Sequence, residues 1–404
     1  MTDLFLSIYN SIPPELLLIL IAAAKAFFII FLVVLPMVSY TVYAERRVSA
    51  AMQDRVGPNR TGFPLTLLGF KKDLQLYLGG LGQPIADAMK FILKEDFTPA
   101  YVKKFWFWVA PCLAMMPLVT LAFIPFGSTL FGEKMVISDI NVGLLGVFAI
   151  TSLGVYAIVL AGWASNSKYP FLGGIRSTSQ MISYELSMGL SLIPILMLLG
   201  GLTGGSSKLS DLVNLQADHG WLLLPLWGNG LSLERWLMLI PLGISFVVFT
   251  ISIFAETNRL PFDMPESETE LVAGYHTEYS SMKFALFFLG EYTAMIVGSS
   301  MIVVFFFGGW SLPFIPNGSG TAPAFFQSMF GGLYAMVPNW IWGLANITVF
   351  FAKVAVVLFC FIWVRWTVPR FRFDQLMKLG WLYLFEIALV NIFITAGILA
   401  YIHK

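Results

Sequence analysis

Six carboxylates occur within residues 256–283, a segment between two long apolar stretches: Glu256, Asp263, Glu266, Glu268, Glu270 and Glu278. Only two cations, Arg259 and Lys283, share the segment. A carboxylate held near the low dielectric of a membrane has a raised pKa, because losing water penalises its charged form. Such groups can take up and release protons near neutral pH. The segment therefore favours a role in proton handling, and a solvated acidic loop is the plainer alternative.

Two further carboxylates lie inside apolar stretches. Glu185 and Glu291 are each about two helical turns from the boundary at which Glu256 ends its own stretch. We therefore expect the three side chains to reach a similar depth, where buried acids are functional by default and structural pairing is the alternative. Glu256 and Arg259 are spaced i, i+3, which favours a local ion pair between them.

The composition is that of an integral membrane protein. Of the 404 residues, 58% are hydrophobic and only 12% are charged, roughly half the charged share of soluble proteins. The mean hydropathy of +0.79 overrides the two or three soluble domains that the length alone suggests. Aromatic residues make up 16% of the chain, which suits anchoring belts at the membrane interface. We expect an all-α, polytopic membrane fold.

Several function classes are disfavoured by the residues that are missing. Cys112 and Cys360 are far apart and form no C-x-x-C pair, which argues against an iron–sulfur cluster in this chain. His219, His276 and His403 all lie outside the expected spans, which argues against a haem held between spans. No glycine-rich phosphate loop and no basic patch interleaved with aromatic residues is present. We expect no metal site, no bound nucleotide and no nucleic-acid partner.

Eight apolar stretches are long enough to cross a bilayer as helices. They cover about residues 15–43, 105–126, 142–163, 178–202, 236–255, 284–308, 339–363 and 379–402. The first is too long for the core of a signal peptide and is interpreted as a retained span. Charged residues also occur inside these stretches, at Lys25, Lys353 and Glu386, for which a structural pair and a proton relay are equally open.

The distribution of basic residues predicts the orientation. The loops on one side hold 18 of the 24 Lys and Arg residues, and four more lie on the other side. By the positive-inside rule, the basic loops are cytoplasmic and both termini lie on the outer side. These cytoplasmic loops are residues 44–104, 164–177, 256–283 and 364–378. Within the first loop, residues 64–80 and 84–94 mix apolar and charged positions at near-helical spacing, which predicts interfacial amphipathic helices.

Two more motifs flank the spans on the expected cytoplasmic side. In residues 45–62, Arg46 follows the first span and Asp54 and Arg55 precede a Gly-Pro-Asn turn. Arginines at this boundary often only stop transfer, whereas the turn favours a shaped loop with internal ion pairs. In residues 363–381, basic residues alternate with Trp and Phe, which fits anchoring and subunit docking.

Five motifs, in this order, resemble the family of quinone-site membrane subunits of respiratory complex I, the proton-translocating NADH:quinone oxidoreductase of bacteria and mitochondria. They are Glu-Arg-Arg…Gln-Asp-Arg-Val-Gly-Pro-Asn at 45–59, Ser-Tyr-Glu-Leu at 183–186, Ala-Glu-Thr-Asn-Arg-Leu-Pro-Phe-Asp at 255–263, Glu-Leu-Val-Ala-Gly-Tyr-His-Thr-Glu-Tyr-Ser at 270–280 and Pro-Arg-Phe-Arg-Phe-Asp-Gln-Leu-Met at 369–377. The likeness is to the bacterial members and extends from about residue 15 to the end. One departure is Leu382, where the family often has Lys.

The resemblance implies an eight-span protein that forms the access path and chamber for ubiquinone or menaquinone and couples quinone reduction to proton pumping. It implies a non-redox component of the oxidoreductase, with no activity of its own, in the bacterial inner membrane. FMN and iron–sulfur clusters would belong to partner subunits. The implied partners are the peripheral-arm iron–sulfur and quinone-site subunits, small membrane subunits, antiporter-like pumping subunits and lipids.

The resemblance also assigns roles to individual residues. Its proton-coupling chain of carboxylates corresponds to Glu185, Glu256, Glu266, Glu268, Glu270 and Glu291, and Asp263 belongs to the same region. Quinone-binding or loop-ordering positions correspond to Arg46, Asp54, Arg55, Arg176 and Arg259.

Two other function classes share parts of this pattern. The membrane anchor of an energy-converting hydrogenase has the same architecture without quinone, but the full Gln-Asp-Arg-Val-Gly-Pro-Asn and Asp-Gln-Leu-Met motifs argue against it. A free-standing proton-coupled transporter is expected to show inverted repeats and broken helices, and neither stands out in the sequence.

The predicted orientation can be tested by labelling. A cysteine introduced at Ser267 should react with an impermeant thiol reagent only from the cytoplasmic side, because the basic loops are retained there. A cysteine at Ser206 should react only from the outer side. The measurement is labelling of intact cells against inverted vesicles, and reversed labelling would overturn the orientation.

Overall fold

The computed structural model describes residues 14–64, 75–76, 79–203, 208–224, 233–265, 271–316 and 336–402. In this part of the chain, seven helices are long and apolar enough to cross a membrane. The predicted all-α, polytopic membrane fold is confirmed. The elements, in chain order, are α2 (Pro14–Phe27), η1 (Phe28–Val34), α3 (Leu35–Met52), β1 (Phe63–Pro64), β2 (Gln75–Leu76), α4 (Gln83–Leu93), α5 (Lys104–Leu113), α6 (Met116–Thr120), β3 (Thr129–Leu130), β4 (Glu133–Lys134), α7 (Gly143–Ala164), α8 (Lys168–Thr203), α9 (Leu209–His219), α10 (Leu233–Glu256), η3 (Gly274–His276), α12 (Ser281–Phe306), α14 (Asn339–Thr367), α15 (Phe373–Lys378), η4 (Leu379–Leu384) and α16 (Phe385–Ile402).

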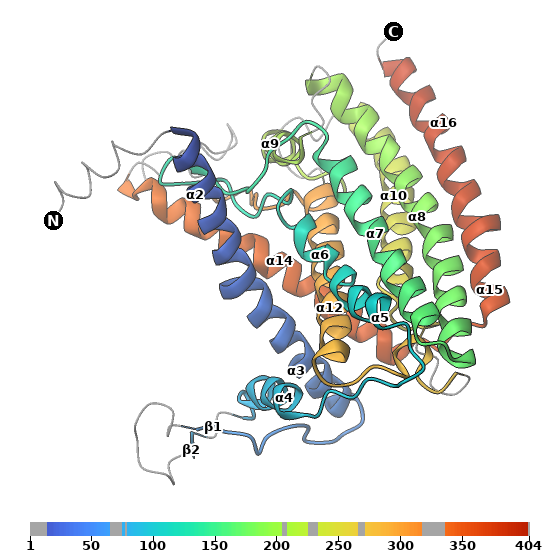
Figure 1. Ribbon diagram of the computed structural model, residues 1–404. Coiled ribbons are helices and arrows are strands. Elements are labelled where there is room, and N and C mark those ends of the chain that lie inside the picture. The colour runs from blue at the N-terminus through green and yellow to red at the C-terminus, as the bar shows by residue number, and fades with distance from the viewer. Residues whose placement is uncertain are drawn as a thin grey trace.

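The long helices form one bundle with two distinct ends (Figure 1). The start of α2, the end of α16 and the short helix α9 lie at one end, which we call the α9 end. The helix α4 and the β1–β2 pair lie at the other, which we call the α4 end. The helix α8 packs against α7, α10 and α16, while α12 packs against α10, α14, α6 and α3.

The second predicted span, residues 105–126, is not one continuous helix. It is split into α5 and α6, with the break at Ala114 and Met115. Pro111 lies inside α5 and Pro117 lies in the first turn of α6, and each lacks the N–H that a continuous helix needs. The prediction of one span over residues 105–126 is therefore wrong at this position, and a broken helix that did not stand out in the sequence is present. After α6 the chain turns through the β3–β4 hairpin instead of continuing as a helix to residue 126.

A glycine lets another helix approach this break closely. A Cβ atom placed on Gly290 of α12 would lie 2.1 Å from the Ala114 carbonyl oxygen. Any side chain at this position would therefore clash with the backbone of the α5–α6 break. The contact brings the turn of α12 that follows Gly290 against the break, and that turn begins with Glu291.

The first and last spans each contain a π-helical segment. The first runs through α2, η1 and α3, and the last runs through α15, η4 and α16. The last is tied to α8, because the Trp381 indole donates to the Ser183 hydroxyl at 2.9 Å and the Tyr184 hydroxyl donates to the Leu376 carbonyl at 2.9 Å. Segments of this kind are rare and often occur at functional sites.

The two amphipathic helices predicted in the first loop have different outcomes. The helix predicted over 84–94 is α4, and its face of Ile85, Met89, Ile92 and Leu93 is exposed. The helix predicted over 64–80 is wrong at Pro64 and at Gln75–Leu76, because Phe63–Pro64 pairs with Gln75–Leu76 as antiparallel strands. Residues 65–74 and 77–78 lie outside the described part.

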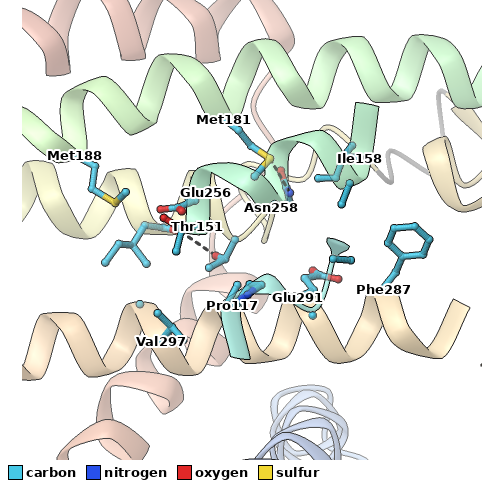
Figure 2. A pocket seen from close by; sticks show the side chains of 18 of the residues that line it. Pro117, Thr151, Ile158, Met181, Met188, Glu256, Asn258, Phe287, Glu291 and Val297 are labelled. Carbon is cyan, nitrogen blue, oxygen red and sulfur yellow. Dashed lines mark hydrogen bonds between the residues drawn. The ribbon is translucent and has the colours of Figure 1, made fainter. Parts of the chain in front are cut away.

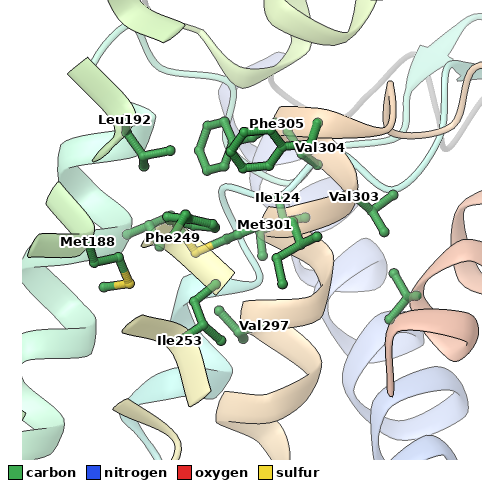
Figure 3. Close-up of a cluster of buried hydrophobic side chains, with 14 of the residues drawn as sticks. Ile124, Met188, Leu192, Phe249, Ile253, Val297, Met301, Val303, Val304 and Phe305 are labelled. Carbon is green, nitrogen blue, oxygen red and sulfur yellow. The ribbon is translucent and has the colours of Figure 1, made fainter. Parts of the chain in front are cut away.

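The centre of the bundle is an apolar contact between α8, α10 and α12 (Figure 3). Met188 and Leu192 of α8 lie beside Phe249 and Ile253 of α10, with Met301 of α12 completing the contact. Because lipid tails are as apolar as these side chains, the contact is stabilised by close van der Waals packing between the helices. This contact sets the spacing of the three helices that carry Glu185, Glu256 and Glu291.

The α9 end is held by a lysine that contacts backbone carbonyls. The Lys353 ammonium group of α14 donates to the carbonyl oxygens of Phe307, Gly309 and Ser311 at 2.8, 2.9 and 2.7 Å. It also lies 4.2 Å from the centre of the Trp221 ring. Because these carbonyls follow the end of α12, Lys353 joins α12 to α14. Lys25 likewise has a structural contact, with Glu133 at 3.2 Å.

The buried His276 predicts acid sensitivity. Burial among aromatic rings lowers the pKa of His276 to about 3, below its ordinary value of 6.5. In the unfolded chain the His276 imidazole is protonated below about pH 6.5, whereas in the folded chain it stays neutral down to about pH 3. The free energy of unfolding should therefore fall as the pH drops from 6.5 toward 3. From pH 7 to pH 5 the loss should be about 2 kcal/mol. We expect H276F to show a smaller fall in the melting temperature of the purified assembled complex over this range.

The control for this measurement is H219F, because His219 is only partly buried. It should retain the wild-type response to acid. An identical acid response in H276F and wild type would show that His276 does not contribute.

Candidate functional site

Four charged side chains from four separate segments meet in the interior toward the α4 end. We call them the charge cluster: Glu45 of α3, Arg259 after α10, Glu291 of α12 and Arg365 of α14. Arg259 Nε lies 2.9 Å from Glu291 Oε1, and Arg259 Nη1 lies 3.6 Å from Glu45 Oε1. Arg365 forms a short hydrogen-bonded ion pair with Glu45. The cluster thus alternates in sign from Arg365 through Glu45 and Arg259 to Glu291.

A tyrosine completes the charge cluster. The Tyr292 hydroxyl donates to Glu45 Oε2 at 2.6 Å. The centre of its ring lies 4.2 Å from the guanidinium carbon of Arg259, which is a cation–π distance. Tyr292 therefore contacts one carboxylate and one cation of the cluster. It directly follows Glu291, so α12 contributes two adjacent members.

The charge cluster is electrically balanced and almost dry. Its side chains are only 5% exposed for Arg259, 8% for Glu45 and 10% for Glu291, and 23% for Arg365. Burial alone would lower the pKa of Arg259, but Glu291, Tyr292 and Glu45 outweigh burial and raise its pKa above the ordinary value. Arg259 therefore stays positively charged. In a low dielectric, two cations and two carboxylates are stable only while both signs are present.

The turn after α10 aims Arg259 at α12. The helix ends at Glu256, and Asn258 adopts a left-handed backbone conformation with φ 51°. Asparagine tolerates this conformation better than most residues. The Phe262 N–H then donates to the Arg259 carbonyl at 2.8 Å, which closes a second turn. These turns carry Arg259 away from the axis of α10.

The predicted local ion pair between Glu256 and Arg259 is therefore wrong. Arg259 pairs with Glu291 and Glu45 instead. The i, i+3 argument assumed that the helix continues beyond Glu256, whereas the left-handed turn at Asn258 separates the two side chains.

Glu256 and Glu291 line the same small cavity (Figure 2). Its volume is about 80 Å³, and Thr151, Met181 and Asn258 also line it. A buried water needs roughly 10–15 Å³ of such volume, so the cavity has room for several waters but not for a quinone ring with its tail. The Thr151 hydroxyl lies within hydrogen-bonding reach of Glu256. The cavity lies between α7, α8, α10 and α12, and its lining is mostly apolar, with the two carboxylates, Thr151 and Asn258 among its few polar groups.

Glu185 approaches this cavity from α8. Its carboxylate is close enough to interact electrostatically with that of Glu256. The structure therefore brings Glu185, Glu256 and Glu291 into one neighbourhood. Glu291 alone belongs both to this group and to the charge cluster.

Asp263 has a separate ion pair. Its Oδ2 lies 2.8 Å from Arg370 Nη2, and Asp263 is 5% exposed. The Phe371 N–H donates to the Pro261 carbonyl at 3.3 Å, which adds a backbone contact. The segment after α10 is thereby fastened to the segment after α14. Glu266, Glu268 and Glu270 lie outside the described residues.

The remaining predicted positions are spread over the α4 end. Arg46 pairs with Asp87 of α4 at 2.6 Å, and Arg176 donates to the sulfur of Met264 at 3.3 Å. Asp54 and Arg55 are exposed, and Arg55 donates to the Gln53 side chain. Of the five predicted quinone-binding or loop-ordering residues, Arg259 is the one that the structure places in the charge cluster.

Three members of the site were not predicted from the sequence. Glu45 precedes Arg46 in the first motif, Tyr292 follows Glu291, and Arg365 is the first basic residue of the segment 363–381. The signal for Glu45 was its position, since a carboxylate before two arginines at the end of a span needs a partner. The alternation of basic and aromatic residues around Arg365 predicts anchoring and subunit docking. Nothing in its own neighbourhood points to Glu45, which is far away in the chain.

No metal site is evident in the part of the chain that the structure describes. There, no group of three or more His, Cys, Asp or Glu side chains is arranged to hold a metal ion. The chemistry that the site can perform is proton uptake, release and transfer between carboxylates, next to a fixed positive charge.

The sequence is similar to one family over nearly its whole length. The profile of the NADH dehydrogenase family matches residues 24–396. The first of the H-type subunits of NADH-quinone oxidoreductase from Geobacter metallireducens is 45% identical over 92% of this chain and 94% of its own length. The H-type subunit of the same enzyme from Ehrlichia ruminantium is 43% identical over 99% of this chain and 94% of its own. That from Rickettsia africae is 45% identical over 90% and 89%.

The balance of the charge cluster can be measured by a double-mutant cycle. R365M should lower the stability of the purified assembled complex by about 3–5 kcal/mol, because it leaves a buried carboxylate without one of its cations. E45Q should also destabilise, and E45Q with R365M should recover much of the loss. The measurement is the melting temperature by intrinsic fluorescence.

The control for this cycle is K134Q. Lys134 pairs with Asp139 at 3.1 Å, but its side chain is 64% exposed. Its loss should cost less than about 1 kcal/mol. Strictly additive effects of E45Q and R365M would mean that the two charges do not stabilise each other.

Proposed function

This chain belongs to the NADH dehydrogenase family, and we propose that it serves there as the membrane component that couples quinone reduction to proton transfer in an NADH:quinone oxidoreductase. The names of its relatives support the enzyme, and the seven apolar helices support a multi-pass membrane protein. The observation that carries the coupling role is the shared residue Glu291. It belongs to the charge cluster and also lines the cavity of Glu256.

The charge cluster supplies the sensitivity that coupling requires. Because two cations balance two carboxylates in a dry site, any charge that appears nearby changes the energy of all four. Reduction of a quinone to the quinol adds two electrons and takes up two protons. The transient negative charge would attract Arg259 and Arg365, and this would weaken the hold of Arg259 on Glu291.

A weakened Arg259–Glu291 pair would change the proton affinity of Glu291. A carboxylate that loses its cation in a low dielectric takes up a proton more readily. The cavity offers water-sized space between Glu291 and Glu256, and Glu185 lies next in line. Protons would therefore pass between these carboxylates, away from the charge cluster. The acidic residues Glu266, Glu268 and Glu270 would continue the same chain.

The quinone itself would bind at the α4 end rather than in this cavity. The cavity is too small for it, whereas α4 exposes an apolar face and is joined to α3 by the Arg46–Asp87 pair. A hydrophobic quinone could pass along this face from the lipid. Arg365, the most exposed member of the charge cluster, would then be the first to meet its head group.

Partner subunits would supply the electrons and use the protons. We infer that peripheral subunits with FMN and iron–sulfur clusters dock on the basic loops, and that pumping subunits of the antiporter type receive the signal. The site would lie in a bacterial inner membrane, with the basic loops inside. The membrane anchor of an energy-converting hydrogenase is the alternative, and the names of the similar proteins favour the quinone enzyme.

Glutamine variants test the coupling role. E256Q and E291Q keep the shape of the side chain but cannot ionise, so each should lower both NADH:quinone turnover and proton pumping on the order of tenfold or more. E256D and E291D keep the carboxylate and should retain more activity. The measurement is turnover and proton uptake in vesicles, normalised to assembled complex.

The matched control is E386Q. Glu386 lies in the first turn of α16 and is exposed on the bundle, away from the cavity lining. It should retain wild-type turnover. Full turnover and full pumping in both E256Q and E291Q would falsify the coupling role.

A further inference from the structure

The turn after α10 must stay in place for Glu256 and Arg259 to reach their partners, and we propose that Gln180 of α8 is the positioning residue that holds it. This inference rests on the proposed function, because it concerns the segment on which coupling depends. Gln180 is uncharged and is not a member of the charge cluster. It is completely buried, with an exposure of 0%.

The contacts of Gln180 are made by its amide nitrogen. Nε2 donates to the Ala255 carbonyl at 2.7 Å and to the Phe262 carbonyl at 2.8 Å. A longer contact of 3.3 Å reaches Asn258 Oδ1. Because both carbonyls are acceptors, only the NH₂ group can face them, and this sets the orientation of the amide.

The two carbonyls lie at the two ends of the turn. Ala255 directly precedes Glu256, and Phe262 directly precedes Asp263. The Ala255 carbonyl belongs to the last turn of α10, where it accepts only a long local bond of 3.3 Å from the Asn258 N–H. A single amide thus satisfies a helix end and holds the far side of the turn against it. Residues 256–261, which include Arg259, are thereby held as a closed loop.

Neighbouring residues of α8 make weaker contacts to the same turn. The Ser177 hydroxyl lies 3.4 Å from Asn258 Oδ1, and Asn258 Nδ2 lies 3.7 Å from the sulfur of Met181. Ser177, Gln180 and Met181 are spaced i, i+3 and i+4, so they lie on one face of α8. Both contacts are long, which leaves the two bonds of Gln180 as the strong ones.

The amide oxygen of Gln180 indicates why the two bonds of its nitrogen matter. Gln180 Oε1 is buried and has no hydrogen-bond donor in the described surroundings. A buried acceptor without a partner destabilises the folded state. Methionine has a similar size and carries no such penalty. A glutamine is therefore expensive at this position, and the two donated bonds are what it provides.

The test is Q180M, with Q180E as a second variant that keeps the shape but lacks the NH₂ group. Both should lower kcat for NADH:quinone turnover per assembled complex on the order of tenfold, because a small displacement of the turn misplaces Glu256 and Arg259. The KM for quinone and NADH oxidation by an artificial acceptor should be unchanged. Hydrogen exchange in peptides covering 255–264 should become faster.

Gln216 provides a matched control. It is also 0% exposed, and its Nε2 donates to the Val304 carbonyl at 2.8 Å, but it joins α9 to the end of α12. Its Oε1 also accepts from the Gly308 N–H at 3.0 Å and from the Leu222 N–H at 3.4 Å. Q216M should therefore cost at least as much stability as Q180M and leave kcat unchanged. An equal fall of kcat in Q216M and Q180M would overturn the inference, because both glutamines would then act only through stability.

Two other results would also overturn it. One is unchanged hydrogen exchange over 255–264 in Q180M and Q180E, and the other is unchanged kcat in both variants. The proposed function is tested by a different experiment: full turnover of E256Q and E291Q would contradict it, whatever Q180M does. Faster exchange in Q180M together with full turnover of those variants would show that Gln180 holds a turn that has no part in coupling.

Discussion

The structure depends on keeping opposite charges together where water is scarce. Glu45, Arg259, Glu291 and Arg365 come from four segments, and none could be buried alone among apolar helices without a large cost. Their mutual pairing therefore constrains where α3, α12 and α14 lie relative to the turn after α10. The apolar contacts between α8, α10 and α12 hold the bundle together, and the charge cluster selects one arrangement of the helices around it. The same balance makes the arrangement responsive to an added charge.

Polar backbone groups at the helix ends also need partners where water is scarce. Splitting one span into α5 and α6 frees carbonyls at Ala114, and the absence of a side chain at Gly290 lets α12 come close to them. At the end of α10 a side chain supplies a hydrogen bond, from Gln180 of α8 to the Ala255 carbonyl. Broken helices are tolerated inside a membrane when neighbouring elements satisfy their free groups. Both breaks lie next to residues of the candidate site, so the irregular backbone and the chemistry occur together.

Most of the fold could be predicted from the sequence, because long apolar stretches and the amphipathic pattern of α4 are local signals. The depth of Glu185, Glu256 and Glu291 could also be inferred, since distance along a helix measures depth in the membrane. The partners of Arg259 could not be, because Glu45 and Glu291 are distant in sequence and the left-handed turn at Asn258 decides which way Arg259 points. The break at residues 114–115 was missed, although Pro111 and Pro117 signal it, because hydropathy averages over the whole stretch. The role of Gln180 could not be predicted, because a single buried amide leaves no periodic or charge pattern in the sequence.

The three carbonyl contacts of Lys353 have a mechanical consequence. An ammonium group directs its hydrogens in three directions, so it resists sliding of α14 along α12 as well as separation of the two helices. A planar guanidinium could not match three converging carbonyls in the same way, so arginine is a poor substitute. Lys353 lies at the middle of α14, so its three bonds fix the midpoint of α14 against the end of α12. The charge cluster joins the same two helices toward the other end of α12, through Glu291 and Arg365, so their relative position is fixed at two levels of the bundle.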